Sequence, residues 1–142
     1  MKKICVVASK YYEDIISMLL DGANDAINIH KKKFKTKVIY VPGVFEIPYT
    51  ISKNIKKYDA FIALGCVIKG ETPHFDFISK SSVDAIMKLS IENKKPIGNG
   101  ILTCLNKDQA FVRADKLNKN KGKEAVDAVI GLLTSDNWHN AD

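Results

Sequence analysis

Four short apolar segments, separated by stretches with helical periodicity, constrain the fold of this chain more than any other feature. Each segment is nearly continuous in apolar residues and does not alternate with polar ones. They read "KICVVAS" (3–9), "KVIYVPG" (37–43), "AFIALGCVI" (60–68) and "PIGNGILTC" (96–104). Continuous apolar runs of this length are typical of parallel strands that are buried on both faces of a sheet. The sequence therefore predicts a parallel sheet of four strands.

The stretches between these segments predict helices. In the first stretch, apolar residues recur at helical spacing, namely Ile16, Leu19, Leu20, Ala23 and Ile27. Four more helices are predicted further along the chain, at 45–57, at 73–92, after Asn106, and at about 122–134.

Residues that favour helix termini support these boundaries. Thr72 is the predicted N-cap of the helix at 73–92, with Pro73 in its first position. Asn106 and Gln109 form a capping-box pattern at the start of the next helix. The segment 134–142 is polar apart from Trp138 and is expected to be a frayed tail.

The order of predicted elements is β-α-β-α-β-α-β-α-α within a single domain, residues 1–142. Strands that alternate with helices in this way imply right-handed crossovers. The predicted fold class is α/β, a flavodoxin-like three-layer α/β/α sandwich with a four-stranded parallel sheet. Ligands of such folds bind outside the carboxyl ends of the strands, so residues just after each strand are the candidates for a site.

Composition excludes several classes of protein. The net charge is +6 and most cations are lysines, because Arg113 is the only arginine. A chain so poor in arginine does not favour a dedicated nucleic-acid surface, where arginine usually reads the bases. No apolar run approaches the roughly 18 residues that a membrane span needs. The apolar run near the N-terminus is too short for a signal peptide, so a cytoplasmic location is expected.

The cysteines and histidines show no metal-binding spacing. Cys5, Cys66 and Cys104 are far apart in apolar runs, where buried thiols behave as small hydrophobic groups. No metal site is therefore expected.

The stretch "GCVIKGETPHFD" (65–76) places unusual residues just where the third strand ends. A helix that begins near Thr72 leaves free N–H groups which, with the helix dipole, suit a phosphate or a carboxylate. Gly70 allows a close approach of the backbone. The same dipole disfavours an imidazolium, so His74 is expected to be neutral and able to accept a proton. The alternative is a surface histidine beside a helix terminus.

The other strand ends also carry candidate groups. Glu46 lies at a helix start and could accept hydrogen bonds from a ligand, or could be a simple N-terminal helix acid. Tyr11 and Tyr12 follow the first strand, where one ring could stack on a planar heterocycle or both could pack internally. Asn99 lies between Gly98 and Gly100, and glycines within a strand often mark a close approach. No Walker loop, dinucleotide fingerprint or nucleophile elbow is present.

Together these stretches resemble the lumazine synthase family. The resemblance covers nearly the whole chain and depends on "VPGVFEIP" (41–48), "ALGCVIKGETPHFDFIS" (63–79), "PIGNGILTCLNKDQA" (96–110) and "RADKLNKNKGKEA" (113–125). It implies condensation of 5-amino-6-(D-ribitylamino)uracil with 3,4-dihydroxy-2-butanone 4-phosphate, which gives 6,7-dimethyl-8-ribityllumazine, phosphate and water. These two small molecules would be the substrates, and no metal or organic cofactor is implied.

The resemblance also implies roles for individual residues. His74 would be the general acid/base, and Arg113 would bind the phosphate together with the backbone at Glu71 and Thr72. The remaining matches are to positions that contact the pyrimidine or its ribityl chain, or that place a basic group near the site. They are Val44, Phe45 and Glu46 for the ribityl chain, Cys66, Val67 and Ile68 for the pyrimidine, Tyr11 and Asn99 on the pyrimidine side, and Lys121 as the basic residue.

Some positions depart from the family pattern. Many members have Arg-Phe-Asn where this chain has "KYY", so that Tyr12 replaces an asparagine. Asn99 stands where phenylalanine is common, and Lys69 stands where arginine is commoner. Cys66 stands where a small or hydroxyl residue is frequent. Since none of these affects His74 or Arg113, an active enzyme is expected.

The family resemblance implies a homo-oligomer, either a pentamer or a pentamer-based shell, with active sites shared between neighbouring subunits. Asn99, Arg113 and Lys121 would then serve the site of the adjacent subunit, and riboflavin synthase is a candidate partner. The N-terminus starts almost directly at the first strand, which favours a free pentamer.

Two other functions remain open from the sequence. A flavin- or pterin-binding carrier would bind its ligand without turnover. A basic RNA-binding module would show an affinity that falls steeply with salt.

Overall fold

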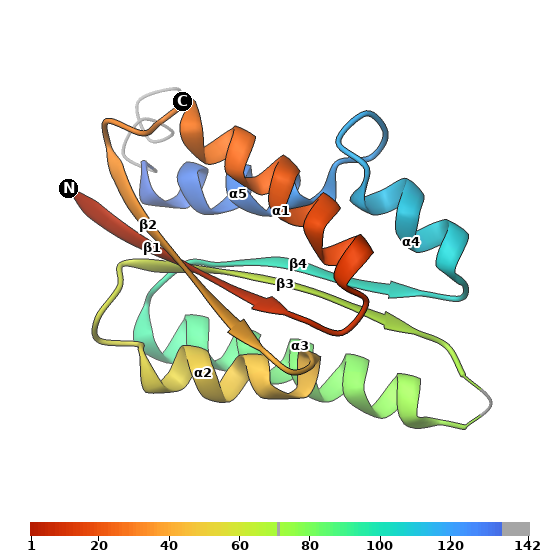
Figure 1. Ribbon diagram of the computed structural model, residues 1–142. Coiled ribbons are helices and arrows are strands. Elements are labelled where there is room, and N and C mark those ends of the chain that lie inside the picture. The colour runs from red at the N-terminus through yellow and green to blue at the C-terminus, as the bar shows by residue number, and fades with distance from the viewer. Residues whose placement is uncertain (71, 135–142) are drawn as a thin grey trace, which may run out of the picture.

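The computed structural model describes residues 1–70 and 72–134, and Figure 1 shows a twisted parallel sheet between two layers of helices. The strands of these residues are β1 (Lys2–Ser9), β2 (Phe34–Val41), β3 (Ala60–Ile68) and β4 (Ile97–Cys104). All neighbouring strands pair in parallel, in the order β2-β1-β3-β4. The predicted fold class, a three-layer α/β/α sandwich with a four-stranded parallel sheet, is confirmed.

The helices divide between the two faces of the sheet (Figure 1). One face is covered by α1 (Glu13–Asn28), α4 (Lys107–Ala114) and α5 (Lys121–Leu133). The other face is covered by a short 3-10 helix, η1 (Val44–Glu46), and by α2 (Ile47–Lys53) and α3 (His74–Asn93). In the described residues no helix is both long enough and apolar enough to cross a membrane.

Two apolar cores follow from the alternation of side chains along the strands. In β1, Ile4 and Val6 point toward the α1 side, whereas Cys5 and Val7 point toward the α2 side. All four are fully buried, and β3 divides its residues in the same way. A central strand thus needs apolar residues at every position, which explains the continuous runs in the sequence.

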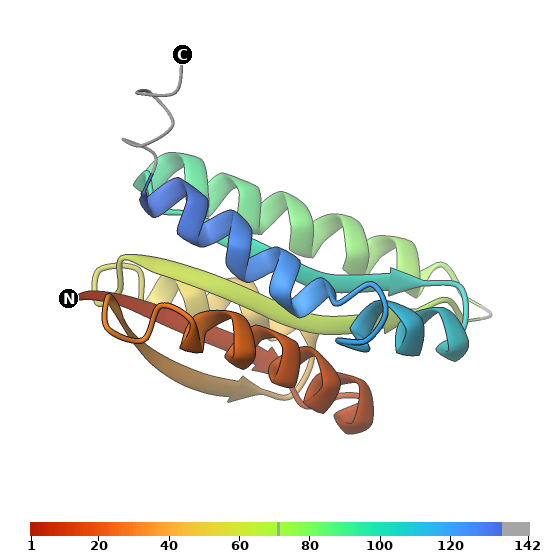
Figure 2. The same ribbon diagram turned by 90° about the horizontal axis from the view of Figure 1, so that it is seen from above.

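The first core is closed by unusually tight packing of α5 on α1, which lie side by side in Figure 2. A Cβ atom on Gly122, in the first turn of α5, would lie 2.2 Å from the carbonyl oxygen of Leu19 in α1. A Cβ atom on Gly98 in β4 would lie 2.4 Å from the carbonyl oxygen of Ala125. Only glycine fits at these two contacts, so the predicted close approach at Gly98 is confirmed.

Three boundaries differ from the sequence-based expectation. The helix predicted at 45–57 is shorter, because residues 44–46 form η1 and α2 ends at Lys53, followed by turns. The strand β2 begins at Phe34 and not at 37, because it is an edge strand whose lysines, such as Lys35, face solvent while Phe34 is buried. The helix α3 begins at His74, and its cap is Pro73 rather than Thr72. The carbonyl oxygen of Pro73 accepts hydrogen bonds from the backbone N–H groups of Asp76 and Phe77.

The predicted cap at Asn106 is confirmed. Its side-chain oxygen accepts a hydrogen bond of 2.9 Å from the backbone N–H of Gln109. The side chain of Gln109 accepts from the backbone N–H of Leu105, one residue before the cap, so the reciprocal bond is shifted from the capping-box pattern. The helix α5 ends at Leu133, and the rest of the predicted frayed tail, residues 135–142, lies outside the described residues.

Candidate functional site

A cleft of about 720 Å³ lies at the carboxyl ends of β1, β2 and β3. This is the edge of a parallel sheet where ligands of doubly wound folds bind, and the volume is in the usual range for a small-molecule site. The cleft is lined by residues from four separate segments of the chain: Tyr11, Tyr12, Gly43, Val44, Phe45, Glu46, Cys66, Val67, Ile68, Gly70, Thr72, His74, Phe75 and Ile78. Most of the residues predicted from the sequence therefore lie together.

The segment after β2 forms one wall through η1. Glu46 is the residue before α2, and its half-buried side chain reaches the cleft. A Cβ atom on Gly43 would lie 3.3 Å from the Oε1 atom of Glu46, so glycine leaves room for this carboxylate. Phe45 is 65% exposed at the rim, whereas Val44 is buried. The wall thus offers an acceptor and an apolar ring to a ligand.

Gly65, in the middle of β3, sets how closely this wall approaches the sheet. A Cβ atom at Gly65 would lie 2.6 Å from the Cγ2 atom of Val44. Since real Cβ contacts are not this short, any other residue would push η1 outward. The sequence reasoning did not assign a role to Gly65, and its only signal was a glycine inside a strand.

The turn after β1 contributes a second part of the lining through Tyr11 and Tyr12. The rings of Tyr11 and Tyr12 meet edge to face, with their centroids 4.7 Å apart and their planes at 76°. Tyr11 is 63% exposed, whereas Tyr12 is half-buried and packs against the core on the α1 side. Burial, with smaller contributions from Tyr11 and Cys66, raises the pKa of the Tyr12 phenol despite the opposing charge of Lys107. Its hydroxyl is therefore neutral at physiological pH.

The floor of the cleft is the end of β3. Cys66 is 3% exposed, and burial raises the pKa of its thiol to about 12, with smaller contributions from Cys104 and Asp14. Such a thiol is protonated at neutral pH and does not act as a nucleophile. Val67 and Ile68 follow it on the floor. All three cysteines are buried and free, as expected for thiols in apolar runs.

The start of α3 closes the cleft on the remaining side. His74 is the first residue of this 20-residue helix and is exposed toward the cleft, with Thr72 just before it. The first N–H groups of a helix have no partner within it and carry a partial positive charge. The start of this helix therefore lies beside an imidazole, and anion binding there stays a prediction. Glu71, which was predicted to contribute its backbone, lies outside the described residues.

Two residues of this side were missed by sequence reasoning. Phe75 and Ile78 line the cleft one turn apart on α3 and also pack against the core on the α2 side. Their spacing of three residues is a helical signal, but it did not distinguish a cleft wall from ordinary core.

Three predicted site residues lie away from the cleft within this chain: Asn99, Arg113 and Lys121. Asn99 is on the edge strand β4, where its Oδ1 atom accepts a hydrogen bond of 3.0 Å from the backbone N–H of Ile101. Arg113 is in the last turn of α4, and its Nη1 atom donates to the carbonyl oxygen of Gln109 over 3.2 Å. Lys121 begins α5 and pairs with Glu124 over 2.9 Å.

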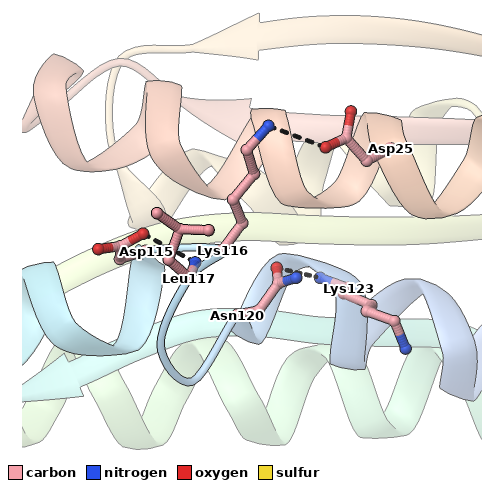
Figure 3. A network of polar contacts seen from close by, with 6 residues as sticks. All are labelled: Asp25, Asp115, Lys116, Leu117, Asn120 and Lys123. Atoms are coloured by element: carbon pink, nitrogen blue, oxygen red, sulfur yellow. Dashed lines mark hydrogen bonds and ion pairs between the residues drawn. The ribbon is translucent and has the colours of Figure 1, made fainter.

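A short loop, residues 115–120, joins α4, which contains Arg113, to α5, which begins at Lys121. Figure 3 shows the polar contacts around this loop. The Nζ atom of Lys116 lies 2.9 Å from the Oδ2 atom of Asp25 in α1. Asp115 accepts a hydrogen bond of 2.9 Å from the backbone N–H of Leu117. Asn120 caps α5 by accepting from the backbone N–H of Lys123. This loop is therefore held both by its own backbone and by α1.

In the part of the chain that the structure describes, no group of three or more His, Cys, Asp or Glu residues could hold a metal ion. What the cleft offers is a carboxylate, an imidazole, aromatic rings and the amide groups of a helix start. The carboxylate and the rings suit a planar, hydroxylated ligand, and the helix start suits an anion beside it. The imidazole could transfer a proton between the two ligands.

The fold and the cleft define a parallel α/β protein with a small-molecule site at the carboxyl edge of its sheet. Comparisons with known proteins narrow this class. The family model described as 6,7-dimethyl-8-ribityllumazine synthase matches residues 1–136. The chain belongs to this family.

Individual relatives are similar to this chain over 80% or more of their own length. A protein of Zymomonas mobilis named 6,7-dimethyl-8-ribityllumazine synthase is 43% identical over 135 residues, which cover 94% of this chain and 95% of the relative. Proteins of the same name from Bartonella tribocorum and Methylobacterium radiotolerans are 41% and 43% identical, each over 92% of this chain and over 87% and 80% of the relatives.

Proposed function

We propose that this protein is an enzyme of riboflavin biosynthesis, a transferase that makes 6,7-dimethyl-8-ribityllumazine. The substrates are 5-amino-6-(D-ribitylamino)uracil and 3,4-dihydroxy-2-butanone 4-phosphate, and the other products are phosphate and water. The observation that carries the proposal is that the stretches after β1, β2 and β3, which are distant in sequence, line one cleft. A family match over residues 1–136 supports the same reaction.

The walls of the cleft suit the pyrimidine substrate. The ribityl hydroxyls lie along η1, where the Glu46 carboxylate accepts hydrogen bonds and Val44 and Phe45 supply contact area. The pyrimidine ring lies over the end of β3, where Cys66, Val67 and Ile68 offer backbone groups, and Tyr11 stacks on its face. In this arrangement the amine that reacts is held close to the start of α3.

The start of α3 suits the phosphorylated ketone. Its phosphate is bound by free N–H groups near Thr72, with those of Glu71 as a further prediction, because helix N-termini stabilise anions. His74 then lies beside the ketone, where it passes protons during formation of the Schiff base and loss of phosphate. Holding both substrates in one orientation accounts for a large share of the rate enhancement.

A homo-oligomer completes the site in this proposal. In the described residues the cleft of one chain is lined by no arginine or lysine, and Arg113 and Lys121 lie elsewhere. We infer that Arg113, Lys121 and Asn99 reach the cleft of a neighbouring subunit, where the guanidinium forms a bidentate contact with the phosphate. Exposed apolar side chains on α3, namely Phe77, Met87 and Ile91, are consistent with such an assembly.

The assembly would be a pentamer or a pentamer-based shell in the cytoplasm. Riboflavin synthase is the candidate protein partner, and neither nucleic acid nor a membrane is proposed as one.

The direct test is to incubate the purified protein with both substrates and to follow product fluorescence and free phosphate. Formation of both in equal amounts is expected, whereas binding of the pyrimidine without turnover would indicate a carrier and contradict the proposal. His74→Ala is expected to lower kcat on the order of 10²-fold, because it removes the proton-transfer group. Lys123→Ala, an exposed change on α5, serves as the control.

Arg113 tests the shared site. Arg113→Ala is expected to raise the KM for the butanone phosphate by roughly 100-fold or more, because each of the two charge-assisted hydrogen bonds contributes about 1.5–3 kcal/mol. The KM for the pyrimidine should stay near that of the wild type. Coexpression of Arg113→Ala and His74→Ala subunits should recover activity above either variant alone, because some mixed interfaces carry both intact residues. No recovery in verified mixed oligomers would mean that the two residues serve the same chain's site.

A further inference from the structure

The backbone of Tyr12 has a conformation that tyrosine rarely adopts. Its φ and ψ angles are 63° and 62°, in the left-handed region. Among the described non-glycine residues, Lys94 and Asn120 also have positive φ. Lys94 follows a helix C-terminus, where this conformation is common, and asparagine tolerates it well. Neither explanation applies to Tyr12, because it is a tyrosine that precedes the N-terminus of α1.

The turn that contains Tyr12 is fixed at both of its ends. The backbone N–H of Lys10 donates to the carbonyl oxygen of Val41 over 2.8 Å, which ties the turn to β2. The backbone N–H of Tyr11 donates over 3.2 Å to the Oγ atom of Ser9, which is fully buried. The carbonyl oxygen of Tyr12 accepts from the backbone N–H of Ile16 over 3.0 Å, the first bond of α1. Surrounding structure therefore holds the unfavourable conformation in place.

This conformation gives the two neighbouring tyrosines different environments. The Tyr12 ring borders the cleft but packs against the core on the α1 side, whereas the Tyr11 ring is largely exposed at the cleft. The two rings meet edge to face at 4.7 Å, which is a favourable aromatic geometry. An exposed tyrosine on a turn would otherwise sample several rotamers, and it would lose that freedom when a ligand binds.

We propose that Tyr12 is a positioning residue that holds the Tyr11 ring in a fixed orientation against the planar pyrimidine substrate. This inference rests on the proposed function, since it takes the pyrimidine to be the substrate that the Tyr11 ring contacts. Tyr12 acts through Tyr11 and prepares its ring before the substrate arrives. The left-handed backbone at Tyr12 accompanies a ring that packs against the core and contacts the Tyr11 ring.

The first test compares two substitutions at this position. Tyr12→Asn keeps a residue that tolerates the left-handed conformation but removes the ring, so the turn is retained. The KM for 5-amino-6-(D-ribitylamino)uracil is expected to rise roughly tenfold, because Tyr11 must be ordered on binding. The KM for the butanone phosphate and kcat should stay within about twofold of the wild type. Tyr12→Phe keeps the ring and should match the wild type.

A double-mutant cycle separates positioning from direct contact. If Tyr12 acts through Tyr11, the double variant Tyr11→Ala, Tyr12→Asn should have the same pyrimidine KM as Tyr11→Ala alone. Additive increases would overturn the proposal, because they would mean that each ring contacts the substrate independently. A loss of affinity in Tyr12→Phe would overturn it too, since the hydroxyl and not the ring would then be responsible.

A measurement without substrate keeps this test distinct from that of the proposed function. In the free protein, the Tyr11 ring protons should show a ring-current shift from Tyr12 in the NMR spectrum, assigned with Tyr11→Phe. The shift should vanish in Tyr12→Asn and persist in Tyr12→Phe. Unchanged Tyr11 resonances in Tyr12→Asn would overturn the positioning role even in an active enzyme. If the wild type lacked activity with both substrates, only the proposed function would fail.

Discussion

The long helices on the two faces of the sheet differ in how completely one chain buries them. The 16-residue helix α1 buries Ile15, Ile16, Leu19, Gly22, Ala23, Ala26 and Ile27. The 20-residue helix α3 buries only Ser82 and Ile86, and leaves Phe77, Met87 and Ile91 more than half exposed. Within residues 1–70 and 72–134, α1 is thus packed along its apolar side, whereas α3 has apolar side chains that no described residue covers.

Polar groups on the two faces show the same contrast. At the tight α1–α5 contact, the cap residue Asn120 has its side chain satisfied by the N–H of Lys123. On α3, the Oγ atoms of Ser79 and Ser82 are buried without a hydrogen-bond partner in the described residues. Buried polar atoms are usually paired, so these two hydroxyls are exceptions within the described residues. One face therefore supplies stability, and the other carries His74, the proposed acid/base group, and the surface proposed for assembly.

The largest expected effect is on the unfolding free energy, at the contact between α5 and α1. Gly122→Ala would place a Cβ atom 2.2 Å from the carbonyl oxygen of Leu19 and 3.0 Å from the backbone nitrogen of Ala23. Because backbone atoms cannot rotate away, α5 must move off α1, and a loss of about 3 kcal/mol in unfolding free energy is expected. Urea denaturation followed by circular dichroism measures this loss.

Lys123→Ala in the same turn is the matched control. Its ammonium pairs only with Asp127 on an exposed surface, so less than about 0.5 kcal/mol should be lost. A stability loss for Gly122→Ala as small as that of the control would contradict the tight packing of α5 on α1.

The next effect concerns assembly through the exposed apolar surface of α3. Met87→Asp places a charge on a position that is 58% exposed in the single chain. If this surface is buried between subunits, desolvating the charge should weaken assembly by about 2 kcal/mol or more, while the helix content stays unchanged. Light scattering should then report a smaller mass. Asn24→Asp adds the same charge to the exposed side of α1, and its mass should equal that of the wild type.

The contrast between the faces also explains how much could be predicted from sequence. Continuous apolar strands and the apolar periodicity of α1 are strong local signals that predicted the fold, and the capping pattern of Asn106 and Gln109 predicted the cap of α4. The start of β2 was missed, because the lysines of an edge strand look like a solvated loop. The cap of α3 was misplaced by one residue, because Pro73 could fill either position.

The candidate site was predictable where it follows strand ends, and less so where distant segments meet. Val44, Glu46 and His74 line the cleft as the order of elements suggested. The contact between Gly65 and Val44, and the left-handed backbone of Tyr12, depend on tertiary packing that no local pattern encodes. The role of Arg113 stays a prediction, since it lies outside the cleft of its own chain.

A smaller effect is expected where the sheet meets the cleft wall. Gly65→Ala should push Val44 and η1 outward, because its Cβ atom would lie 2.6 Å from the Cγ2 atom of Val44. The KM for the pyrimidine substrate is expected to rise about tenfold, or about 1.4 kcal/mol, with less change in the KM for the phosphate substrate. Adding Val44→Ala removes the clashing methyl group, and should recover part of the loss. No recovery would mean that the wall is not displaced by this contact.

The smallest effect tests the burial of the central strand, where both faces of the sheet meet. Burial raises the pKa of the Cys5 thiol from 9.0 to about 11, against a smaller opposing effect of Lys37. At a pH between the two pKa values, 9.0 and about 11, the thiol is mostly deprotonated in the unfolded chain but protonated in the folded protein. The free energy of unfolding therefore falls as the pH rises. From pH 8 to 9.5 the thiol should account for a loss of about 1 kcal/mol in unfolding free energy. Cys5→Ala should therefore show a shallower decline than the wild type, whereas Val7→Ala, an equally buried change without a titrating group, should decline in parallel with it. Equal slopes for all three proteins would mean that Cys5 titrates in the folded state as it does in the unfolded chain, and that the strand is more open to solvent than its packing indicates.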